Sequence, residues 1–190
     1  MALRRTRTSE QERTARGSWH LDGAQGSFWS GILLAAAVFT IIDETILHLL
    51  LHWHHFYDRA SPGFALTSDG IFQAVGVISL VASAYLVADL RRRAVWRPIW
   101  LATGLAFGLG IIGLIDEVVV HKILNWHQIH YGAEVWKYDI GAGLCIVTAL
   151  LAGAALLRIA RRGGEDLRIG KSQVLSESER PDDTDRNADG

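Results

Sequence analysis

Cysteine is almost absent from the chain. Cys145 is the single cysteine among 190 residues, which excludes a disulfide within the chain and a metal site built from several thiolates. Because Cys145 lies in an apolar run, we interpret it as a small packed hydrophobic residue. The sequence also lacks a glycine-rich phosphate-binding loop, a nucleophile elbow and a basic nucleic-acid-binding patch. These absences argue against a nucleotide-binding protein, a serine hydrolase and a nucleic-acid partner.

Long apolar runs dominate the sequence instead. Hydrophobic residues make up 49% of the chain, and four runs reach the roughly 20 residues that a helix needs to cross about 30 Å of hydrocarbon. We therefore predict an all-α, polytopic four-helix bundle in a lipid bilayer. Small residues such as Gly104 and Gly108 predict close helix packing. The predicted helices cover about residues 28–55, 69–91, 97–127 and 139–162, within one domain at 28–162.

Basic residues predict how the helices are oriented. Twelve arginines flank one end of the predicted helices, at positions 4, 5, 7, 13, 16, 91–93, 97, 158, 161 and 162, and only Arg59, Lys122 and Lys137 flank the other. The positive-inside rule then predicts two cytoplasmic termini in a multi-pass protein of the inner (plasma) membrane. No cleavable signal peptide is visible. Polar composition predicts disordered cytoplasmic tails at 1–27 and, with acidic character, at 163–190.

A polar motif occurs twice at a spacing of 73 residues. Asp43-Glu44 is followed by His48, and Asp116-Glu117 by His121; a Trp-His pair then ends each segment at His54 and at His127. Both copies lie inside apolar runs, where ionisable groups are costly unless they serve a purpose. The spacing predicts two parallel two-helix repeats, whose equivalent residues face each other at one depth.

The chemistry of these residues predicts a metal site. On a regular helix Glu44 and His48 share one face, as do Glu117 and His121, so these four are the first-choice ligands. Asp43 lies about 16 Å from His54 on a straight helix. We therefore predict an inner layer and a separate outer layer. Further candidate ligands are Asp43 and Asp116, then Asp69 and Asp139, and in the outer layer His54 and His127.

Asp69 and Asp139 have a second interpretation, because each is expected to begin a helix. A helix N-cap favours aspartate, whose carboxylate accepts hydrogen bonds from free backbone amides. Trp and Tyr beside the outer histidines are typical of membrane interfaces. Capping and interface anchoring are therefore alternatives to ligation for these residues.

Several functions fit these residues. Mixed imidazole and carboxylate donors suit Fe, Zn, Cu or Mn, in a mononuclear or dinuclear site for redox chemistry or metal handling. His48 and His121 could instead ligate haem, although the adjacent acids disfavour a macrocycle. A proton, ion or metal transporter would use the same residues as a relay, and simple structural pairing is also open. The sequence leaves open whether the protein is an enzyme, a homo-oligomer or an accessory subunit of a respiratory or metal-handling complex.

The motifs also carry a family resemblance. The chain resembles, over roughly residues 28–160, an uncharacterised bacterial membrane-protein family catalogued as domain of unknown function twenty-two forty-three. The matching residues are Asp43, His48, Trp53, His54, His55, Asp69, Gly70, Ile71 and Phe72, then Asp116, His121, His127 and Asp139. Gln73 and Gln128 stand where the family pattern has histidine. The resemblance implies a four-helix membrane protein and supplies no established activity.

Overall fold

The computed structural model describes residues 22–131 and 134–178, which are helical and contain no strand. Its long helices are α2 (Gly23–Ile42), α3 (Pro62–Arg92), α4 (Pro98–Leu114) and α5 (Val135–Ser178). Two π-helical segments, η1 (Asp43–Leu50) and η2 (Ile115–Leu124), continue α2 and α4. Four helices are long and apolar enough to cross a membrane, which confirms the predicted fold class.

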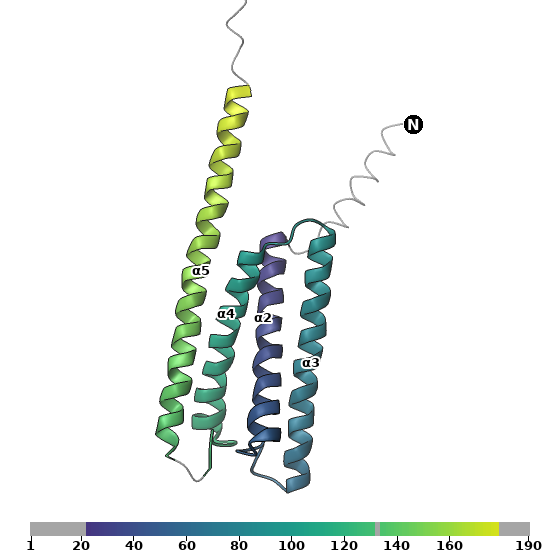
Figure 1. Cartoon of the computed structure of the whole chain (residues 1–190), viewed down its shortest axis with the longest axis vertical. Coiled ribbons are helices and arrows are strands. Elements are labelled where there is room, and N and C mark those ends of the chain that lie inside the picture. The colour runs from purple at the N-terminus through teal and green to yellow at the C-terminus, as the bar shows by residue number, and fades with distance from the viewer. Residues whose placement is uncertain (1–21, 132–133, 179–190) are drawn as a thin grey trace, which may run out of the picture.

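The helices stand side by side in the order α5, α4, α2, α3 (Figure 1). Their central contact, between α2 and α4, is very close. A Cβ on Gly31 would lie 2.2 Å from the carbonyl oxygen of Leu101, and one on Gly104 would lie 2.0 Å from that of Phe28. Because any side chain at these positions would meet backbone, glycine is required there.

Two helices begin earlier than the sequence predicts. Ser61 caps α3 and accepts a hydrogen bond from the Phe64 amide, with Pro62 in the first turn, a combination typical of helix starts. Asp69 therefore lies inside α3. Asp139 likewise lies inside α5, which begins at Val135. The N-cap interpretation of both aspartates is wrong, because each side chain is one turn or more past its helix start.

The far end of α5 also differs from expectation. The helix continues to Ser178, whereas the sequence predicts a tail from residue 163. Residues 165–178 include Glu, Leu, Arg, Lys and Gln, which are good helix formers, and this local preference outweighs the pair Gly163-Gly164. The predictions for residues 1–21 and 179–190 fall outside the described residues.

The two π-helical segments end in the same way, at positions 73 residues apart. His52 and Asn125 have φ angles of 53° and 50°, in the left-handed region that ends a helix. After them, the Trp53 amide donates to the Leu47 carbonyl and the Trp126 amide to the Val120 carbonyl. Each chain segment therefore turns back beside its own helix end, before the ends predicted at residues 55 and 127.

Candidate metal centre

The π-helical backbone brings two acids to one histidine ring in the first half. His48 Nδ1 lies 3.0 Å from Glu44 Oε1, at ion-pair distance but outside hydrogen-bond geometry, and His48 Nε2 lies 3.5 Å from Asp43 Oδ2. A regular α-helix aligns residues four apart, whereas the wider π-turn hydrogen-bonds residues five apart. The residues four and five positions before His48 therefore both reach its ring.

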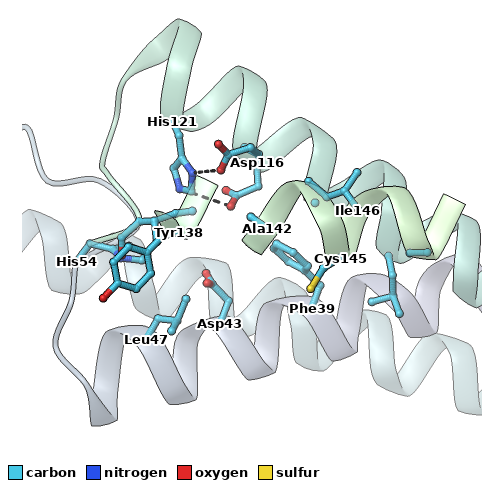
Figure 2. A pocket seen from close by; sticks show the side chains of 15 residues that line it. Phe39, Asp43, Leu47, His54, Asp116, His121, Tyr138, Ala142, Cys145 and Ile146 are labelled. Carbon is cyan, nitrogen blue, oxygen red and sulfur yellow. Dashed lines mark hydrogen bonds and ion pairs between the residues drawn. The ribbon is translucent and has the colours of Figure 1, made fainter. Parts of the chain in front are cut away.

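The second half repeats this arrangement with the same distances. His121 Nδ1 lies 3.0 Å from Glu117 Oε2, and His121 Nε2 lies 3.5 Å from Asp116 Oδ2 (Figure 2). Glu117 accepts the hydrogen bond from Nδ1 when that nitrogen carries the proton. Each ring thus has a glutamate at Nδ1 and an aspartate near Nε2. Nε2 is the nitrogen that remains available to bind a further partner.

The prediction of two separate layers is wrong. His54 returns to His48, with ring centroids 4.5 Å apart, and His127 returns to His121, at 4.6 Å. The His54 and His127 rings stack on each other at 4.5 Å with an interplanar angle of 7°. All four rings therefore form one buried cluster, because the chain turns at residues 52 and 125 instead of continuing as a straight helix.

Each half fixes the ring that the other half contributes. His54 Nδ1 donates to the Ile129 carbonyl at 2.9 Å, and His127 Nδ1 donates to the Phe56 carbonyl at 2.8 Å. A carbonyl only accepts, so Nδ1 carries the proton in both rings. The neutral ring then presents the lone pair of Nε2, as metal-ligating histidines do when a carbonyl holds the other nitrogen.

Burial keeps His54 and His127 neutral. Burial, followed by repulsion from the neighbouring imidazoles, lowers the pKa of His54 to about 2. Burial is also the largest cause at His127, whose pKa falls to about 4. Both rings are therefore neutral at physiological pH, with a proton on Nδ1 and none on Nε2, which is the form that binds a metal ion.

Three groups of residues could each hold an ion. In each group, one ligand atom per residue lies within 4.8 Å of the others. The groups are Asp43, His48 and His54; Asp116, His121 and His127; and Glu44, His48 and Asp69. The Nε2 atoms of His48, His54 and His121 have no hydrogen-bond partner in the described part of the chain, and an unpaired buried nitrogen is unfavourable unless a ligand satisfies it.

The two halves differ around Asp69 and Asp139. Asp69 contacts His55 Nδ1 at 2.6 Å, the Phe56 amide at 2.7 Å and His48 Nδ1 at 3.3 Å. Asp139 instead accepts a hydrogen bond from Lys122 Nζ at 2.6 Å. The structure therefore brings Asp69 to the histidine cluster and pairs Asp139 with a lysine.

Sequence reasoning gave Lys122 no role in the site. Its ammonium also lies 3.5 Å from Glu117 Oε1, so it neutralises an acid beside His121. The available signal was a lysine directly after His121 inside an apolar segment, where a charged residue needs a partner. His52, by contrast, is exposed and belongs to none of the three groups.

The fold and site together define a class: a four-helix membrane protein with imidazoles and carboxylates buried at one end of its helices. The chain belongs to the family described as Predicted membrane protein (DUF2243), which matches residues 30–160. Comparisons with curated proteins and with solved structures gave no match. Family membership confirms the resemblance carried by the motifs and assigns the protein no activity.

Proposed function

We propose that this protein binds two transition-metal ions in the membrane, one in each Asp-His-His set. The observation that carries the proposal is the matched pair of sets, each with three ligand atoms within 4.8 Å. Their unpaired imidazole nitrogens support it, because a bilayer provides no water to pair them. Two histidines and one carboxylate per ion form a donor set used by redox-active and Lewis-acidic metals.

The ligand assignment follows from the contacts of each ring. Asp43, His48 and His54 would hold one ion, and Asp116, His121 and His127 the other. Glu44 and Glu117 were the first-choice ligands from sequence, but their carboxylates lie against Nδ1. We therefore propose that both glutamates orient the ligating rings, and that Asp69 holds the loop beside His55 and Phe56. Asp139 is not among the proposed ligands, because it pairs with Lys122.

Iron, manganese, copper and zinc all accept imidazole and carboxylate donors, so the donor set alone does not choose among them. Such an ion would supply electron transfer or polarisation of a bound oxygen atom. The chain's own residues bury the ions, fix the rings and hold the acids at Nε2. We propose redox chemistry as the function that this shielded arrangement supports best, with metal handling as the second candidate.

Two earlier alternatives have less support. A haem between His48 and His121 would need a flat space there, yet the stacked rings of His54 and His127 occupy the centre of the cluster. A transport route would need a continuous polar path between α2 and α4, where instead glycine meets backbone at Gly31 and Gly104. The buried hydroxyls of Ser30 and Thr103 donate to carbonyls of their own helices. These contacts favour a site closed on the far side of the cluster.

Elemental analysis of detergent-purified protein tests the proposal. We expect about two equivalents of a transition metal per chain, one for each donor set. An optical spectrum recorded on the same sample would reveal a Soret band if the cofactor were haem. The proposal is wrong if the folded protein holds no metal after purification and after incubation with Fe(II), Mn(II), Cu(II) or Zn(II).

Replacing Glu44 or Glu117 by glutamine should weaken metal binding without abolishing it. Loss of a carboxylate that orients a ligating histidine costs about 10-fold to 100-fold in metal affinity. Competition with a chromophoric chelator measures this change. Glu134→Gln is the matched control, because Glu134 is exposed and pairs with Lys137, away from the histidine rings. Complete loss of one equivalent in Glu44→Gln would instead make Glu44 a ligand.

A further inference from the structure

A cavity of about 420 Å³ lies between α2, α4 and α5, beside the histidine cluster. Most of its wall is apolar and includes Phe39, Leu109, Ile146 and Ala149. One end is polar, and there Asp43, Asp116, His121 and Tyr138 line the space (Figure 2). This volume is within the range of small-molecule sites, which combine apolar walls with a few polar groups.

Small side chains on α5 leave this space open. Ala142 and Cys145 line the cavity, whereas the residues 73 positions earlier, on α3, are Asp69 and Phe72. Asp69 reaches His48 and His55, and Phe72 stacks on Phe56 with centroids 4.4 Å apart. The side chains of Asp69 and Phe72 therefore occupy these positions on α3 and contact the loop that follows η1. The protein departs from its own repeat where the cavity lies.

The cavity opens toward the hydrocarbon region of the membrane. Cys145 is on its wall and is exposed, so its interpretation as a packed residue is wrong. In the described part of the chain, α5 packs against α4 and makes no backbone contact with α2. Cys145 follows the start of α5 by ten residues, which is about 15 Å along the helix, or half the thickness of the hydrocarbon layer. A ligand entering there would come from the lipid phase.

The polar end selects the chemistry of the ligand. Its carboxylates are hydrogen-bond acceptors, each with a second oxygen beyond the one that a metal ion would take. A hydrocarbon would leave these acceptors unpaired, and a fatty acid would bring a further negative charge to a group of carboxylates. A neutral molecule with an apolar body and a hydroxyl donor satisfies both ends of the cavity.

We propose that this cavity binds a lipid-soluble phenol or quinol, with its hydroxyl group directed at Asp43 and Asp116. This inference rests on the proposed function, since the ligand would be the substrate of the metal centre. Ring and tail lie along the apolar wall near Phe39 and Ile146. Entry passes Cys145, so an occupied cavity shields that thiol.

The single cysteine provides the test. Protein in detergent is alkylated at Cys145 with a lipid-soluble maleimide, and mass spectrometry measures the rate of alkylation. The rate is compared in the presence of 4-octylphenol, octylbenzene or 4-octylbenzoic acid. At a phenol concentration roughly ten times its Kd, mass action predicts labelling about tenfold slower. Octylbenzene and the acid should leave the rate unchanged. Equal protection by all three compounds, as an ordinary lipid site would give, overturns the proposal.

Cavity-filling variants locate the effect. Ala142→Phe places a ring in the cavity and should abolish protection by 4-octylphenol. Leu144→Phe is the control, because Leu144 is an exposed neighbour on α5, and protection should persist. Metal content is measured on every sample. If the unmodified protein binds the expected metal but 4-octylphenol does not slow labelling of Cys145, the cavity proposal alone is wrong. If 4-octylphenol slows labelling of a protein that takes up no metal, the proposed function is wrong.

Discussion

Replacing His48 by glutamine is expected to remove one of two bound metal equivalents, and replacing His121 as well should remove the other. Each ring contributes the Nε2 atom nearest its aspartate, and an amide is a far weaker metal ligand than an imidazole. Glutamine keeps a polar group for the neighbouring acids, so the fold should persist. Elemental analysis gives the stoichiometry, and circular dichroism of the same sample reports helix content.

His52→Asn is the control for this experiment. His52 is exposed and adopts a positive φ angle, which asparagine tolerates well. The variant removes a nearby histidine and should retain both equivalents. If His48→Gln kept full metal content in a folded protein, His48 would not be a ligand and the Asp-His-His assignment would be lost.

Introducing alanine at both Gly31 and Gly104 should strongly destabilise the assembled helices. The two new Cβ atoms would lie 2.2 Å and 2.0 Å from carbonyl oxygens of the facing helix, so α2 and α4 must separate. Overpacking of this kind costs about 1–3 kcal/mol at each site. SDS titration followed by circular dichroism measures the loss of stability, and metal content should fall with it because both halves supply the cluster.

Gly143→Ala provides the matched comparison. A Cβ at Gly143 meets nothing within 4 Å, and alanine favours a helix over glycine by about 1 kcal/mol in water. That variant should therefore unfold at the same or a higher SDS concentration. An unchanged midpoint in Gly31→Ala/Gly104→Ala would contradict the close contact between α2 and α4.

The membrane fold and the identity of the polar residues could be predicted from sequence because both leave direct signals. A run of about 20 apolar residues has few structural outcomes. Acidic residues and histidine are energetically costly inside such runs, so their repetition in two of them indicates a functional site. Asp43, His48, His121 and Asp116 were predicted near one centre on this basis, and the structure places each aspartate 3.5 Å from its histidine.

The arrangement around each ring could not be predicted, because it depends on a change in backbone hydrogen bonding. Helical arithmetic at about 100° per residue placed Asp43 off the face shared by Glu44 and His48. The π-helical segment brings both acids to the ring, and residue composition carries no clear signal for it. Asn125 was a usable signal for the following turn, because asparagine favours positive φ; His52 was a weaker one.

The start of α3 was missed for a different reason. Ser61-Pro62 is a recognisable helix start, but the apolar run that predicts this helix begins only at residue 70. The segment from Pro62 to Asp69 mixes polar and apolar residues, so hydropathy alone started the predicted helix too late. Asp69 was therefore expected to cap the helix, whereas in the structure it lies inside α3 and contacts His48 and His55.

The crossed hydrogen bonds of His54 and His127 make the two halves mutually dependent. Each imidazole is aimed by a main-chain carbonyl that belongs to the opposite half, and no side-chain substitution removes a carbonyl. Either half made as a separate polypeptide would keep its histidine ligand atoms but lose the carbonyl that orients its imidazole ring.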